Sequence, residues 1–175
     1  MTKRMHTLKI DRAKGVYYLC IICIFLAILS SCTHQPSSSE IGNMWAEKIV
    51  DMINSKDKNE VLLLFSQSRK DSDYDISHKL DLLLESFDGN VIEYHSIIGE
   101  SEEWNNGRLV SSNITVHIYD LISITGKKYH IVINGYGESK TEYEKGIVVI
   151  DVYEIDSSST SSKDTLICSI GKWDV

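Results

Sequence analysis

After residue 40, apolar residues recur at spacings of three and four, the period of an α-helix with one buried face. One such face is formed by Ile41, Trp45, Ile49 and Ile53. The same period predicts two shorter helices, over 61–65 and 76–87, and Asp57 with Glu60 resembles a capping box for the first of them. The polar segment 66–71 is expected to be a loop.

From residue 91 the period of the pattern changes to two, as in strands with one buried face. The expected strands cover residues 91–98, 108–124, 128–136, 146–156 and 165–170. On the second strand Ile114, Val116 and Ile118 share one side, and the strand is long enough to contain a bulge. The pattern predicts an α+β domain, with three N-terminal helices packed on a curved antiparallel sheet of about five strands. The concave side of this sheet is expected to form a cavity.

Another apolar run lies near the start of the chain, from Val16 to Leu29, behind a segment with five basic residues and one acid. It has 14 residues, whereas a helix needs roughly 20 to cross a bilayer core. A signal peptide is therefore favoured over a transmembrane anchor. The run closes in Leu29-Ser30-Ser31-Cys32, which resembles the lipobox of bacterial lipoproteins.

The lipobox divides the chain into three predicted parts. Residues 1–31 are a lipoprotein signal peptide, which a signal peptidase recognises through Leu29, Ser30 and Ser31. Residues 32–40 are the lipidated Cys32 and a serine-rich tether. Residues 41–175 are a single α+β domain.

Charge and cysteine content limit the partners of this predicted domain. The whole chain has a net charge of −7, but without residues 1–31 it has 13 bases and 24 acids, a net charge of −11. An acidic surface disfavours nucleic acid and anionic lipid headgroups. Cys20 and Cys23 lie in the apolar leader and Cys32 belongs to the lipobox, which leaves Cys168 without an internal partner. We expect Cys168 to be a small buried side chain.

Several features together resemble an uncharacterised family, a domain of unknown function found in small lipoproteins of Gram-positive bacteria. They are the lipobox, the serine-rich tether, the amphipathic helix, the short apolar helix 61–65 and the strand 146–152. In outline that family is similar to the nuclear transport factor 2-like (SnoaL-like, ketosteroid-isomerase-like) α+β cone. A cystatin-like helix-on-sheet fold is the alternative. The cone hosts isomerases, dehydratases and plain binding modules, so the resemblance does not choose a function.

Four residues are candidates for a pocket or a contact surface: Trp104, His117, Tyr119 and Tyr153. An isomerase-type site would need an acid as proton shuttle and a tyrosine hydroxyl as oxyanion donor in an apolar cavity. Aromatic pairs across strands also stabilise a sheet without any chemistry. Because Trp104 adjoins the turn signal Asn105-Asn106-Gly107, it is expected to be exposed.

No metal or cofactor is expected. His95, His117 and His130 fall on three different predicted strands without the spacing of metal ligands, and no phosphate or dinucleotide motif is present.

The sequence therefore favours a lipid-anchored, non-enzymatic module on the extracytoplasmic face of the cell membrane, which binds an unknown small molecule or protein. A small-molecule isomerase or dehydratase with a cone-shaped pocket, and an immunity-like surface protein, are the alternatives.

Overall fold

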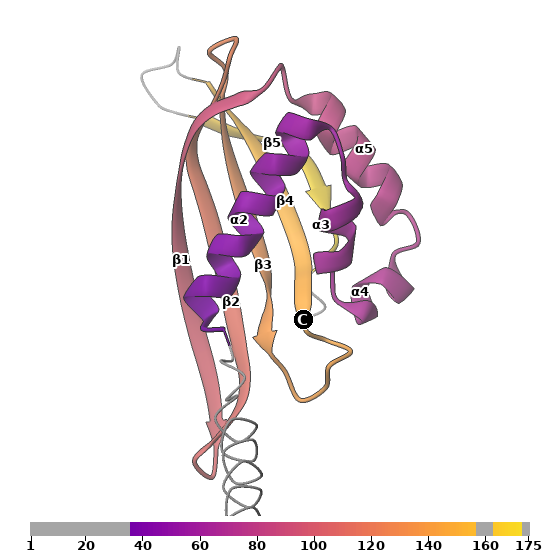
Figure 1. Ribbon diagram of the computed structural model, residues 1–175, viewed down its shortest axis with the longest axis vertical. Helices are drawn as coiled ribbons and strands as arrows, with labels where there is room; N and C mark the ends of the chain where they lie inside the picture. The colour runs from indigo at the N-terminus through magenta and orange to yellow at the C-terminus, as the bar shows by residue number, and fades with distance from the viewer. Residues whose placement is uncertain (1–35, 157–162, 173–175) are drawn as a thin grey trace, which may run out of the picture. The chain divides into compact units, whose positions relative to one another are not determined.

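The computed structural model describes residues 36–156 and 163–172. Along this part of the chain four helices precede five antiparallel strands, which confirms the predicted α+β class (Figure 1). The predicted signal peptide, its recognition residues and Cys32 lie outside the described residues. Among the helices of the described part, none is both long and apolar enough to cross a membrane.

Helix α2, Ser38–Ser55, begins earlier than the apolar pattern predicts. The Ser37 hydroxyl accepts a hydrogen bond from the backbone N–H of Glu40, and the Glu40 carboxylate accepts one from the backbone N–H of Ser37. This capping box satisfies two free N–H groups and fixes the first turn of the helix. Three residues of the expected tether, 38–40, are therefore helical.

The shorter helices are α3, Asn59–Leu64, α4, Gln67–Ser72, and α5, Ile76–Ser86. Helix α4 occupies the expected loop, so the count of three helices is one too low. Its first turn is capped by the Ser66 hydroxyl, which accepts a hydrogen bond from the Arg69 backbone N–H at 3.2 Å. The expected capping box at Asp57 is wrong, because α3 has Lys58 at its N-cap and no side-chain cap.

The five strands form one open sheet in sequence order, each antiparallel to the next. They are β1 (Val91–Asn105), β2 (Arg108–Ser123), β3 (Lys128–Glu138), β4 (Gly146–Asp156) and β5 (Lys163–Ile170). The turn between β1 and β2 has positive φ angles at Asn106 (51°) and Gly107 (74°), as the predicted hairpin requires. Strand β1 is seven residues longer than expected, because its polar second half pairs with β2.

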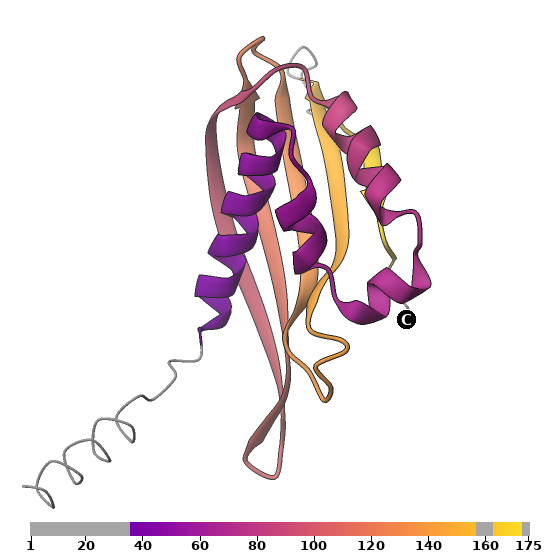
Figure 2. The same cartoon turned by 45° about the vertical axis from the view of Figure 1, so that its right-hand side comes forward.

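The helices lie on one side of this sheet and leave its other side open (Figures 1 and 2). Side chains of the covered side are fully buried under α2, α3 and α5; they include Ile114, Val116, Ile118, Ile131 and Ile133. Helix α2 approaches β1 closely at Gly42, where an added Cβ would lie 2.8 Å from Cγ1 of Ile98. The expected cavity on this side is thus filled by a packed core.

Candidate binding face

The side of the sheet opposite the helices, hereafter the open face, carries a row of side chains that crosses all five strands. The row consists of His95, Tyr119, His130, Tyr153 and Leu166. Its members are neighbours because the register pairs His95 with Tyr119, His130 with Tyr153, and Tyr153 with Leu166. Residues directly opposite on paired strands share one face, so the row is a continuous band.

A bulge in β2 completes the row between β2 and β3. The pairing passes from Ile118–Ile131 to Leu121–Tyr129, so two residues of β2, Tyr119 and Asp120, stand opposite His130. Asp120 has a φ of +48°, a conformation that aspartate tolerates better than most residues. The bulge brings the rings of Tyr119 and His130 to a centroid distance of 4.5 Å.

His117 extends the band toward the middle of the sheet. Its Nδ1 lies 3.3 Å from Nε2 of His130, and its ring is parallel to that of Tyr119, with a centroid distance of 5.4 Å. The two imidazoles can share one N–H···N hydrogen bond, in which the tautomer decides which ring donates. His117, Tyr119, His130 and Tyr153 form one half-buried cluster, in which each ring contacts at least one other.

The environment of His130 favours its neutral form. Burial, and then the neighbouring His117, lower the pKa of His130, while Asp164 acts in the opposite direction. The Asp164 carboxylate lies 3.9 Å from Nδ1 of His130, too far for a strong hydrogen bond. A lowered pKa keeps the imidazole of His130 uncharged at neutral pH.

Three of the four predicted contact residues, His117, Tyr119 and Tyr153, therefore meet, but on the open face and not in a cavity. The fourth, Trp104, lies near the tip of the β1–β2 hairpin, 58% exposed, and its indole N–H donates to Glu102 at 2.7 Å. Along β2 its partner Leu109 is eight residues from His117, about 26 Å at ~3.3 Å per residue. Trp104 is thus separate from the cluster.

His130 belongs to this cluster but was not among the four contact residues predicted from the sequence. The signal was present, because the alternation around Tyr129 and Ile131 places His130 on the polar side of its strand. In the described residues no group of three or more histidine, cysteine, aspartate or glutamate side chains is arranged to hold a metal ion. Cys168 is half-buried, and burial raises the pKa of its thiol.

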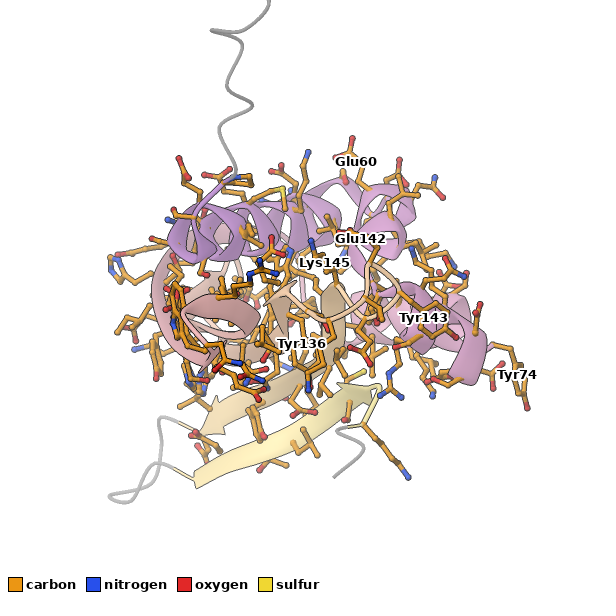
Figure 3. The ribbon with its side chains drawn as sticks, turned by 90° about the horizontal axis from the view of Figure 1, so that it is seen from below. Glu60, Tyr74, Tyr136, Glu142, Tyr143 and Lys145 are labelled. Carbon is orange, nitrogen blue, oxygen red and sulfur yellow. The ribbon has the colours of Figure 1, made fainter. Side chains whose placement is uncertain are left out.

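A second feature is a cleft of about 330 Å³ between α4 and the β3–β4 loop, lined by residues that include Arg69, Tyr136 and Glu144. Figure 3 shows Tyr143 on this loop; its hydroxyl donates to the Asp71 carboxylate at 3.0 Å and fixes the loop to α4. The cleft is mainly polar, and its carboxylates, on Glu103 and Glu144, are exposed. Exposed carboxylates lack the desolvation that makes an acid an effective proton shuttle.

More than half of the chain matches a known protein family. The model of a family described as "Domain of unknown function (DUF5104)" matches residues 48–161. This range begins within α2 and ends just after β4, so it includes the strands that carry the histidine and tyrosine cluster. No curated protein sequence matches the chain.

Proposed function

This chain belongs to the DUF5104 family of domains of unknown function, and we propose that it is a bacterial lipoprotein whose folded domain binds another protein through the open face. The observation that carries the proposal is the half-buried cluster of His117, Tyr119, His130 and Tyr153, on a side of the sheet that no described helix covers. Tyrosine is enriched where proteins bind one another, because it combines a large apolar ring with a hydroxyl group.

The form of this surface favours a protein over a small molecule. A small ligand needs a concave pocket that buries most of its surface. The open face is the exposed side of a sheet, and Ile97 and Leu166 beside the rings are 60% and 52% exposed. Exposed apolar residues around an aromatic centre are typical of a docking surface.

Membrane attachment is the second part of the proposal. Leu29-Ser30-Ser31 would direct cleavage before Cys32, and the lipidated cysteine would hold the domain on the extracytoplasmic face of the cell membrane. Two or more acyl chains give a stable anchor, whereas one chain binds only marginally. The nuclear transport factor 2-like cone is kept as the proposed fold relationship, since helices cover one side of a twisted sheet here as well.

Anchoring is tested with the variant Cys32→Ala. We expect it to lose incorporation of labelled palmitate and to leave the membrane fraction. Continued labelling and sedimentation with membranes would show that Cys32 is not the attachment site.

The open face is tested by photo-crosslinking in cells of the source organism. A photoreactive amino acid at position 119 or 153 should give a discrete protein adduct, while the same amino acid at Asn43, an exposed position on α2, should not. Adducts of equal yield from all three positions, or none from 119 and 153, would contradict the assignment of the binding face.

A further inference from the structure

Strand β1 forms one edge of the sheet, at the left in Figure 1, and within the described residues β2 is the one strand that pairs with it. Each edge strand has a helix packed against it, α2 on β1 and α5 on β5, but β1 is much the longer edge, with 15 residues against eight in β5. An uncovered edge strand presents unpaired backbone N–H and C=O groups, to which a further strand can bind.

The segment of β1 from His95 to Glu103 has the regular geometry that such binding requires. All nine of its residues pair with β2 in a single register, and the irregularities lie outside the segment, before His95 and after Glu103. Nine residues at ~3.3 Å each give an edge of about 30 Å. The segment also lacks proline and lysine, two residues that often block edge strands.

At the beginning of β1, by contrast, the backbone groups of Val91 already have hydrogen-bond partners. The side-chain amide of Asn54 donates to the Val91 carbonyl at 3.4 Å and accepts from the Val91 N–H at 2.7 Å. The edge available to a partner therefore begins beyond Val91.

The charges along this edge indicate the chemistry of the partner. Strand β1 has four glutamates, at 93, 100, 102 and 103, and no lysine or arginine. Lysine and arginine ion pairs within the described residues do not include Glu100, Glu102 or Glu103, all of which are exposed.

These three glutamates lie on both faces of the strand. Glu100 and Glu102 share the side of the buried Ile114 and Ser112, whereas Glu103 pairs with Ser111 on the other side. An added strand would therefore meet carboxylates on both of its own faces.

We propose that the free edge of β1, from His95 to Glu103, binds an extended lysine- or arginine-rich segment of a partner protein as an additional strand. Opposite charges directly across two strands stabilise their pairing, and like charges destabilise it. A second copy of this chain would bring four more glutamates to the same edge, so charge disfavours self-pairing and favours a basic segment. The edge shares His95 and Ile97 with the open face, but it would bind through the backbone groups of β1 and not through the tyrosine and histidine rings, so either surface could bind without the other.

The register gives the order of residues in an antiparallel partner strand. Basic residues belong opposite Glu103, Glu102 and Glu100, and an apolar residue belongs opposite the exposed Ile97. From N- to C-terminus, a matching probe is the labelled peptide Lys-Lys-Thr-Lys-Thr-Thr-Val-Thr-Thr. The full-length chain in non-ionic detergent is titrated with it, and binding is followed by fluorescence anisotropy.

Two modified peptides separate strand addition from simple charge attraction. One is N-methylated at its odd positions and the other at its even positions, so charge and sequence are unchanged. In an added strand alternate N–H groups face β1. We expect one modified peptide to bind within about threefold of the parent and the other at least about tenfold more weakly, because only one loses its backbone hydrogen bonds. Equal binding of both, or no binding of the parent, would overturn the proposal.

Variants of the protein test the charge argument. Glu100→Lys with Glu102→Lys should weaken binding of the parent peptide at least about tenfold and strengthen binding of a peptide with glutamate in place of lysine. The matched control, Glu47→Lys with Glu85→Lys, makes the same change in net charge at exposed helix positions and should have little effect. An equal loss in the control would show that net charge, and not the edge, attracts the peptide.

Two further measurements separate this proposal from the others. His130→Ala with Tyr153→Ala alters the open face on β3 and β4, away from β1, and should leave the peptide affinity within about threefold. Failure of the open-face proposal and failure of the edge proposal can therefore be told apart. Sedimentation of the peptide-free protein reports self-association. A dimer that forms through β1 and excludes the peptide would assign the edge to a second copy instead.

Discussion

Whether the covered side of the sheet has room for a ligand depends on how closely α2 packs against β1. The variant Gly42→Ala tests how close this packing is. In a helix interior, alanine is favoured over glycine by about 1 kcal/mol. Here the new Cβ would lie 2.8 and 2.9 Å from Cγ1 and Cγ2 of Ile98 and 3.3 Å from Cγ2 of Val116. Overpacking of this kind costs about 1–3 kcal/mol. Since the overlap involves two neighbours, we expect a net loss of about 1–2 kcal/mol in the free energy of unfolding.

Urea unfolding of a soluble form, residues 33–175, measures this loss, and a double-mutant cycle identifies its cause. With Ile98→Ala present, the two closest atoms are gone and the 3.3 Å contact with Cγ2 of Val116 remains, so Gly42→Ala should lie between neutral and stabilising by about 1 kcal/mol. The matched control is Gly99→Ala on β1, where the nearest atoms to the new Cβ lie 3.8 Å away and no loss is expected. A gain of about 1 kcal/mol from Gly42→Ala alone would refute the reasoning and reopen the enzymatic alternative, with a cavity under α2.

Three further predictions concern a helix cap, a buried hydroxyl and a histidine. Ser37→Ala should destabilise the domain by about 1 kcal/mol in urea unfolding, because α2 loses its capping box, while Ser39→Ala should not. Tyr129→Phe removes the hydroxyl that accepts a hydrogen bond from the Asp88 N–H at 3.2 Å and should cost about 1 kcal/mol by the same measurement; an unchanged midpoint would contradict that bond. The pKa of His130 is lowered in the folded state, so its contribution to stability is complete above the unfolded pKa of about 6.5 and is lost as pH falls toward the folded value. The difference in stability between the wild-type protein and His130→Phe should therefore change between pH 7.5 and 5.5, and a constant difference would show that the pKa is not lowered.

The regular part of the fold could be predicted from the sequence because burial has a period there. The strand over 146–156 has the predicted bounds, and the buried side of β2 is the predicted one. Helix α4 was missed because its stability does not come from an apolar face. It depends on the Ser66 cap and on the burial of Arg69, which is 7% exposed. The second half of β1 was missed because both of its faces are exposed, so its pattern has no period.

In the candidate site, too, the features set by the local sequence pattern could be predicted, and those set by tertiary packing could not. Alternation placed His117 and Tyr119 on one side of their strand, and the structure confirms this. The contact of Tyr119 with His130 depends on the bulge at Tyr119 and Asp120. The sequence predicted room for a bulge in this strand but not its position. Which side of the sheet the helices cover depends on tertiary packing, which the alternation does not predict. The candidate residues were expected to line a pocket, but they lie on the uncovered side of the sheet.

The open face and the edge of β1 share two residues, His95 and Ile97. Ile97 lies on the open face opposite His117, and it also belongs to the regular segment of the edge. A strand added to β1 would continue the sheet, so the next part of a bound partner could pass onto the open face beside His95 and Tyr119. If one partner uses both surfaces, Ile97→Asp should weaken both the peptide affinity and the crosslinks from position 119. Glu102→Lys would then reduce the crosslinks as well, whereas unchanged crosslinks in that variant would show that the two surfaces bind different partners.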